Sequence, residues 1–140
     1  MKMRLSLFAL LIWLAASSLG LAQDFPKVSA LRAYEQAKSG DWYLVDIRTR
    51  SEWAQGVAEG ASLISMHEPG FLQKLMTLTG GDKQAKIALI CATGGRTNFL
   101  QPELRKRGWT QVYDVSEGMF GSSAGPGWIK RDLPVVKPQP

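Results

Sequence analysis

The feature that most constrains the fold is a short apolar run ending at the only cysteine of the chain. Ile87–Ile90 is bounded by turn-forming residues and is too short for a helix, so it predicts a buried strand. A helical segment, residues 96–107, begins five positions after Cys91. In open α/β sheets, ligands bind where strands end and helices begin, and the amides there favour negative charge. Cys91 is therefore a candidate reactive thiolate, although a lone cysteine beside a strand is often only a small buried hydrophobic residue.

Short predicted strands alternate with helices along the rest of the chain. We expect strands at residues 42–45, 61–65, 87–90 and 111–115, and helices at 30–38, 70–78 and 96–107, with a helical turn at 51–54. This alternation predicts an α/β fold with a parallel sheet covered on both faces. The expected buried helix faces are Leu31, Tyr34 and Ala37 in the first helix, and Phe99, Leu100 and Leu104 in the last.

The first 22 residues have the layout of a secretory signal peptide. Lys2 and Arg4 precede an apolar stretch, and Gly20 and Ala22 occupy the −3 and −1 positions for cleavage before Gln23. We expect export to the periplasm and no stable membrane association after cleavage, with an uncleaved anchor as the alternative. The length predicts one mature domain, residues 23–135. Residues 136–140 are expected to be a flexible tail, within an exposed segment that begins near Lys130.

The composition excludes several classes of function. Without Lys2 and Arg4 the formal net charge falls from +5 to +3, which is too mild to indicate a nucleic-acid partner. A single cysteine excludes a disulfide framework within the chain. One histidine and one cysteine do not supply a Cys/His zinc site, so we expect no metal and no cofactor.

The residues after Cys91 point to chemistry on an anion. Four residues separate Cys91 from Arg96: Ala92, Thr93, Gly94 and Gly95. The glycines allow the backbone amides to turn inward as a concave substrate-binding nest, and Arg96 adds a permanent cation. A Cys91 thiolate in this cradle can attack the outer sulfur of thiosulfate or a similar donor and keep it as a persulfide. A thiol or cyanide acceptor, or a protein thiol, then removes that sulfur.

Other cysteine chemistries fit the sequence less well. A Cys–His enzyme would need His67, the only histidine, beside the thiol, and a dithiol redox motif would need a second cysteine. Cysteine phosphatases place five residues between Cys and Arg, whereas this chain has four, which makes a tighter ring suited to a sulfur atom. The open alternatives are a non-catalytic or partner-dependent sulfur carrier and, with less support, a cysteine phosphatase or arsenate reductase.

With these motifs in order, the chain resembles the rhodanese family of sulfurtransferases over residues 28–135. The segment 91–96 matches the family loop Cys-x-x-Gly-x-Arg, and residues 44–48 resemble the family strand that ends in Asp-x-Arg. Glu52-Trp53 and residues 56–61 resemble the Glu-aromatic and Gly-His-Ile-x-Gly-Ala motifs, with Val57 in place of the histidine. Residues 113–118, Trp128 and residues 133–135 resemble the last strand, its glycine turn and the closing Pro-Val.

The resemblance implies a three-layer rhodanese-like fold with a five-stranded parallel sheet and helices on both faces. It also implies that Cys91 is the nucleophile, that residues 92–96 form the amide cradle and that Arg96 is its cationic rim. Asp46 and Arg48 would hold neighbouring loops by ion pairing. Residues 117–127 are longer and richer in glycine than the family turn, and either line the entrance or form a plain flexible connection. Trp53, Trp109 and Trp128 are expected to pack in the core or at an interface.

Overall fold

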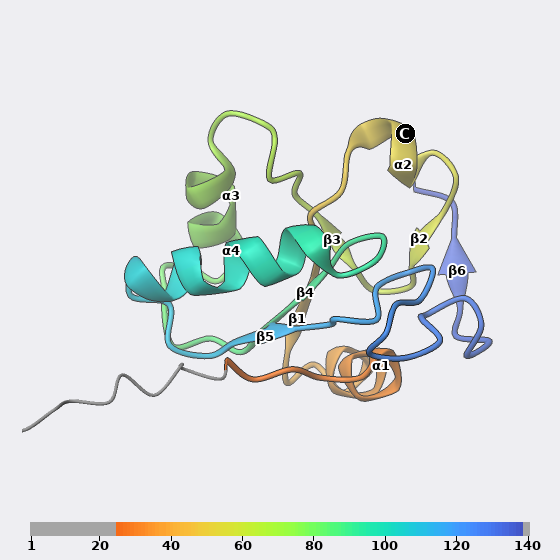
Figure 1. Ribbon diagram of the computed structural model, residues 1–140. Helices are drawn as coiled ribbons and strands as arrows, with labels where there is room; N and C mark the ends of the chain where they lie inside the picture. Colours follow the sequence, from red (N-terminus) through yellow and green to blue (C-terminus); the bar gives the residue numbers. More distant parts are fainter. Residues whose placement is uncertain (1–24, 139–140) are drawn as a thin grey trace, which may run out of the picture.

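The computed structural model describes residues 25–138, in which a parallel sheet lies between helices (Figure 1). The predicted signal peptide lies outside the described residues. The elements in chain order are α1 (Ala30–Lys38), β1 (Tyr43–Asp46), α2 (Arg50–Trp53), β2 (Val57–Ala58), β3 (Ser62–Leu63), α3 (Phe71–Leu78), β4 (Ile87–Ile90), α4 (Gly95–Lys106), β5 (Val112–Asp114) and β6 (Val135–Val136). None of the helices in this part of the chain is both long and apolar enough to span a membrane.

The central sheet has the strand order β3-β1-β4-β5, and all of its pairs are parallel. The predicted parallel α/β fold is therefore confirmed. Four strands make up the sheet where the resemblance implied five, and the fifth position holds a single parallel bridge between Lys27 and Asp114. Asp46 of β1 pairs with Ile90 of β4, so both strands end at the same edge. This register brings the residues after β1 close to Cys91.

The two faces of the sheet alternate along each strand, as the pleat requires. Val45, Leu89 and Val112 pack in one core with residues of α3 and α4, including Leu75 and Leu104. The other core lies on the α1 face, and its main members are Ala30, Ala33, Leu44, Ala88, Ile90, Val115, Met119 and Trp128. Figure 1 shows α3 and α4 on one side of the sheet and α1 on the other. This arrangement confirms the three layers.

Two of the predicted helix-face residues are exposed instead. Leu31 is 43% exposed, while Ala30 and Ala33 are fully buried, because these small side chains let α1 lie close to the sheet. Tyr34 and Ala37 are partly buried against the same core, as predicted. In α4, Leu100 and Leu104 are buried, but Phe99 is 63% exposed.

The segment expected to be an exposed tail contains a short strand. Val135 and Val136 form β6, which pairs antiparallel with β2. The indole Nε1 of Trp128 donates a hydrogen bond to the carbonyl of Pro134 at 2.8 Å. The end of the domain is thus attached to its core. Val135 and Val136 nevertheless keep 43% and 40% of their surface exposed.

Candidate active site

Cys91 lies at the carboxyl end of the central strand β4, and α4 begins four residues later at Gly95. Its side chain is 1% exposed, so the sulfur lies at the base of the loop and not on the surface. The strand, turn and helix that the sequence predicts around this residue are all present. The thiol is the nucleophile candidate nearest to the amino-terminal amides of α4, where negative charge is favoured.

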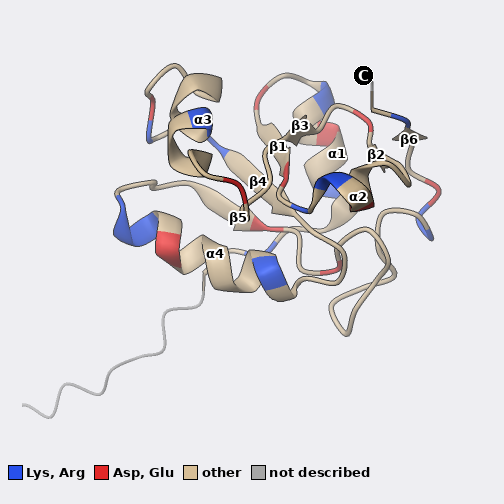
Figure 2. Cartoon of the chain, turned by 90° about the horizontal axis from the view of Figure 1, so that it is seen from above, with Lys and Arg blue, Asp and Glu red and all other residues tan. Residues whose placement is uncertain are grey.

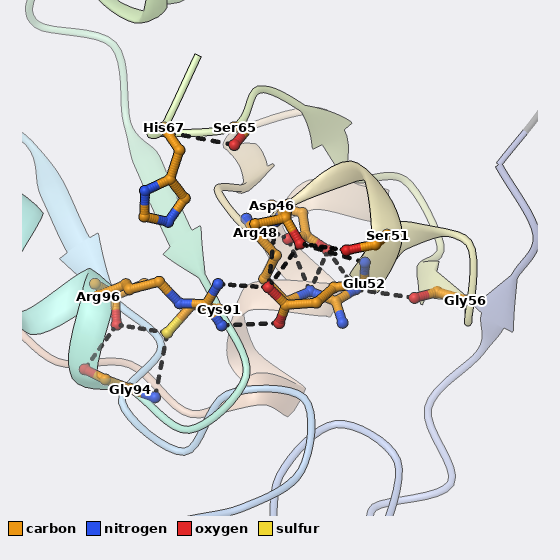
Figure 3. Close-up of polar contacts among 12 residues, drawn as sticks. Asp46, Arg48, Ser51, Glu52, Gly56, Ser65, His67, Cys91, Gly94 and Arg96 are labelled. Carbon is orange, nitrogen blue, oxygen red and sulfur yellow. Dashed lines mark hydrogen bonds and ion pairs between the residues drawn. The ribbon is translucent and has the colours of Figure 1, made fainter.

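Two groups of the loop and helix face the sulfur. The backbone N–H of Gly94 donates a hydrogen bond to Sγ at 3.3 Å (Figure 3). The hydroxyl of Thr97 lies 3.7 Å from Sγ and donates to the carbonyl of Gly94 at 3.1 Å. Hydrogen bonds to an ionised acceptor are stronger than those to a neutral one, so the Gly94 N–H is placed to stabilise negative charge on the sulfur during a reaction. Thr97 is fully buried and was not among the residues that the sequence analysis singled out.

The two glycines of the loop have different roles. Gly94 has a φ of +90°, and a Cβ atom placed on it would collide with the carbonyl of Ser116. Gly95 is the first residue of α4, and a Cβ there would meet no atom within 4 Å. Only Gly94 therefore needs to be glycine for the loop to curl around the sulfur.

Arg96 is bound by a carboxylate that comes from a distant part of the chain. Its Nη1 and Nη2 atoms lie 2.6 and 2.8 Å from Oε1 and Oε2 of Glu52, a two-point ion pair (Figure 3). The hydrogen bonds from Arg96 lower the pKa of Glu52 to about 2, and the same carboxylate raises the pKa of Arg96. Arg96 is thus a paired cation, which the sequence analysis did not foresee.

Glu52 is positioned by the start of the short helix α2. Thr49 caps this helix and donates its hydroxyl and backbone N–H to Glu52 Oε1, at 3.0 and 3.3 Å. The backbone N–H of Glu52 in turn donates to the Thr49 hydroxyl at 3.4 Å, which completes a capping box whose Thr-x-x-Glu spacing is visible in the sequence. That motif predicts the local cap, but it carries no information on Arg96.

Asp46 and Arg48 form the ion pair that the sequence analysis expected. Arg48 Nη2 lies 2.7 Å from Asp46 Oδ2, and both side chains are almost completely buried. The same Nη2 donates to the carbonyl of Gly56 at 2.9 Å. The pair joins the end of β1 to the segment that follows α2, and so it holds the helix that carries Glu52.

The backbone of segment 117–127 is hydrogen-bonded to the backbone of the catalytic loop. The N–H of Met119 donates to the carbonyl of Cys91 at 2.9 Å, and that of Phe120 donates to Ala92 at 3.0 Å. Its anchor is Glu117, which is 2% exposed. Glu117 accepts hydrogen bonds from Ala30 N at 2.6 Å, Gly127 N at 2.9 Å and Arg131 Nε at 2.9 Å.

The tip of this segment also faces a pocket. Residues 122–124 and residues 93–95 line a pocket of about 280 Å³ on the outer side of the catalytic loop. Segment 117–127 therefore supports the catalytic loop and has a polar pocket at its tip. Its hydrogen bonds to the loop do not fit the alternative of a plain flexible connection.

The remaining candidates have structural positions. Trp53, Trp109 and Trp128 are 7%, 2% and 0% exposed, which confirms their packing role. Within residues 25–138 no hydrogen bond joins the ring of His67 to the thiol. Among the same residues, no group of three His, Cys, Asp or Glu side chains is placed to hold a metal ion. Figure 2 shows acidic and basic residues interleaved along the elements, with both signs on α4.

The fold and this cysteine loop define a class of protein. The chain matches the family model of the rhodanese-like domain over residues 29–124, and it belongs to that family. It is 28% identical over 105 residues to a sulfurtransferase of Allochromatium vinosum, a match that covers 74% of this chain and 86% of the relative.

Solved structures agree with this assignment. Rv0390 from M. tuberculosis has a TM-score of 0.66 at 21% identity, and the match covers 83% of this chain and all of that one. The human single-domain sulfurtransferase TSTD1 has a TM-score of 0.51 at 25% identity, with coverage of 66% and 92%. The first likeness supports the fold alone, whereas the Allochromatium relative also supports membership of the sulfurtransferases.

Proposed function

We propose that this protein transfers sulfane sulfur from thiosulfate or a similar donor to a thiol or cyanide through a persulfide on Cys91. The observation that carries the proposal is the position of the Cys91 sulfur. It lies at the end of a buried strand, with the Gly94 N–H 3.3 Å away and only four residues between Cys91 and Arg96. The Allochromatium relative supports the same class of activity.

The reaction has two displacement steps. The Cys91 thiolate attacks the outer sulfur of thiosulfate, the S–S bond of the donor breaks and sulfite leaves with the bonding electrons. The outer sulfur, with its negative charge, is now a Cys91 persulfide close to the loop amides. An acceptor thiolate or cyanide then attacks that sulfur, the new S–S bond breaks and the Cys91 thiolate is restored. Ping-pong kinetics follow from this order.

The buried walls of the site suit a persulfide. Cys91 is 1% exposed and packs in the apolar core of α3 and α4, which limits the access of water to the reactive sulfur. A phosphatase or arsenate reductase would need a wider ring around a tetrahedral oxyanion. The four-residue spacing and the Gly94 contact with Sγ argue against that chemistry.

Mass spectrometry of the intact protein tests the proposal. Protein reduced beforehand and then incubated with thiosulfate, or with an alkyl persulfide, should gain about 32 Da, one sulfur atom. Cys91→Ser should gain nothing. Addition of cyanide should remove the extra mass and release thiocyanate. Absence of the adduct with both donors in the folded wild type would overturn the proposal, as would hydrolysis of an aryl phosphate well above the Cys91→Ser background.

The proposed place of action is the periplasm. The basis is the signal-peptide pattern of residues 1–22, with Gly20 and Ala22 before the cleavage point. Expression of the full chain in a bacterium, followed by cell fractionation, should give a periplasmic protein whose amino terminus is Gln23. An intact amino terminus in the membrane fraction would instead support the anchor.

A further inference from the structure

The cation at the rim of the active site is already neutralised. Both terminal nitrogens of Arg96 bind the Glu52 carboxylate, at 2.6 and 2.8 Å, and the two side chains are 28% and 30% exposed. In this half-buried setting the attraction between unlike charges is stronger than in water. The Arg96 guanidinium therefore presents little net positive charge to an incoming donor.

Glu52 is held in place by more than its ion pair. The hydroxyl and the backbone N–H of Thr49 also donate to it, so the carboxylate has four polar contacts in all when Arg96 is included. The two contacts from Thr49 do not depend on Arg96, so they hold the carboxylate in its place at the rim.

The two arginines that flank the start of α2 do not replace the charge. Arg48 is paired with Asp46 at 2.7 Å, and Arg50 is paired with Glu68 at 2.6 Å. The loop residues between Cys91 and Arg96 are all uncharged. Around Cys91 a donor finds backbone amides and the pair of Arg96 with Glu52, and Lys27 lines the pocket beside residues 93–95.

The charge on the donor then decides how well it reacts. Attack of the Cys91 thiolate on thiosulfate gathers three negative charges in the transition state, next to the fourth on Glu52. Attack on an alkyl persulfide, R–S–SH, gathers one: the thiolate bonds to the terminal sulfur, the S–S bond breaks and R–S⁻ leaves, with the proton kept on the transferred sulfur. An ionised persulfide would bring two charges in total, still fewer than thiosulfate.

We infer that Glu52 is a specificity-determining residue, which makes the site favour neutral or singly charged persulfide donors over dianionic thiosulfate. The inference rests on the proposed sulfur transfer and refines its donor class. Glu52 acts through the charge of Arg96 and not by contact with the reacting sulfur.

Single-turnover kinetics of persulfide formation test this inference. The rate of appearance of the adduct on Cys91, about 32 Da or one sulfur mass, is measured for each variant with thiosulfate and with 2-hydroxyethyl persulfide, which has no charged group besides the persulfide itself. Wild type should react faster with the persulfide. Glu52→Gln should raise the thiosulfate rate about tenfold or more while changing the persulfide rate about threefold or less, because it restores a free cation at the rim. Glu52→Asp, which keeps the negative charge, should keep the wild-type preference.

Glu103→Gln is the matched control. Glu103 pairs with Arg107 on α4 at 3.1 Å, so this variant also removes one carboxylate from an arginine pair, at a site away from the thiol. Its donor preference should equal that of wild type. The inference is overturned if wild type reacts faster with thiosulfate, if Glu52→Gln changes both donors equally, or if Glu52→Asp behaves as Glu52→Gln does. In each of these cases a Cys91 adduct still supports the proposed function, whereas failure of that function would appear as no adduct at all.

Discussion

A Cβ atom on Gly94 would collide with the backbone carbonyl of Ser116, and Gly94 also has a φ of +90°. Gly94→Ala should therefore lower the free energy of unfolding by at least about 2 kcal/mol and displace the amide that faces Cys91. Sulfur transfer should fall by at least about tenfold, since that amide is placed to stabilise negative charge on the reacting sulfur. Urea unfolding and single-turnover mass spectrometry measure both effects.

Gly95→Ala is the internal control for this prediction. Gly95 has free space around its Cα and a helical position, so alanine should leave stability unchanged or raise it by up to about 1 kcal/mol. Equal losses in the two variants would show that the loop geometry described above is incorrect.

Thr97→Val removes one hydroxyl at nearly constant shape. It removes one of the two donors to the carbonyl of Gly94, which keeps the 3.1 Å bond from the Asn98 N–H, and it removes the oxygen that lies 3.7 Å from the Cys91 sulfur. We expect a loss of about 1–2 kcal/mol in the free energy of unfolding. The rate of persulfide formation should fall several-fold, while Thr97→Ser should recover most of that rate. If valine left the rate unchanged, Thr97 would have only a packing role.

Substitution of Glu117 should lower both the stability of the fold and the rate of sulfur transfer. Burial acts to raise the pKa of Glu117, but hydrogen bonds from Arg131, Ala30 and Gly127 outweigh it and the pKa is lowered. Glu117→Gln places an amide donor against two backbone donors, so it should cost about 1–3 kcal/mol of stability. Because residues 119 and 120 bond to the loop, sulfur transfer should also fall. Wild-type activity in the folded Glu117→Gln variant would contradict this support role.

Acid should weaken the fold partly through Glu52. Hydrogen bonds from Arg96 lower the pKa of Glu52 from 4.5 to about 2 in the folded protein. The unfolded chain therefore takes up this proton first as the pH falls. The stabilisation is complete above pH 4.5 and is lost between about 4.5 and 2.

Urea midpoints measured from pH 7 to pH 2.5 test this dependence. Glu52→Gln should flatten the acid slope by an amount on the order of 1 kcal/mol, allowing for solvent screening. Glu35→Gln, an exposed change on α1, should keep the wild-type slope. A Glu52→Gln slope equal to that of wild type would exclude a role of the ion pair in acid stability.

The buried pair of Asp46 and Arg48 gives a prediction about double mutants. Arg48→Leu leaves the Asp46 carboxylate, which is fully buried, without its partner, and should cost about 3–5 kcal/mol. The double variant Asp46→Leu with Arg48→Leu removes both charges and should be more stable than the single variant. A double variant less stable than the single one would show that the pair contributes more than mutual neutralisation.

The elements that the sequence predicts well are those defined by local patterns. The strand Ile87–Ile90 and the helix Ala30–Lys38 have the bounds expected from their residues. The face that each helix buries was predicted less well. The helical period allows two faces of α1 to lie toward the sheet, one with Leu31 and one with Ala30 and Ala33. The alanines face the sheet because α1 packs close to the strands. β2 and β6 are two residues each and exist only as a pair, so neither has a local pattern.

By itself, the sequence determined the order of strands and helices, the family and the loop from Cys91 to Arg96, because turn residues, apolar runs and motif spacing act over a few positions. Only the tertiary structure decided the electrostatic state of that loop. Glu52 meets Arg96 across 44 residues, and Glu117 meets the start of α1 across 87. Such contacts depend on how packed elements bring charges together out of water, which no local pattern specifies. Arg96 is a cation in the sequence and half of an ion pair in the fold.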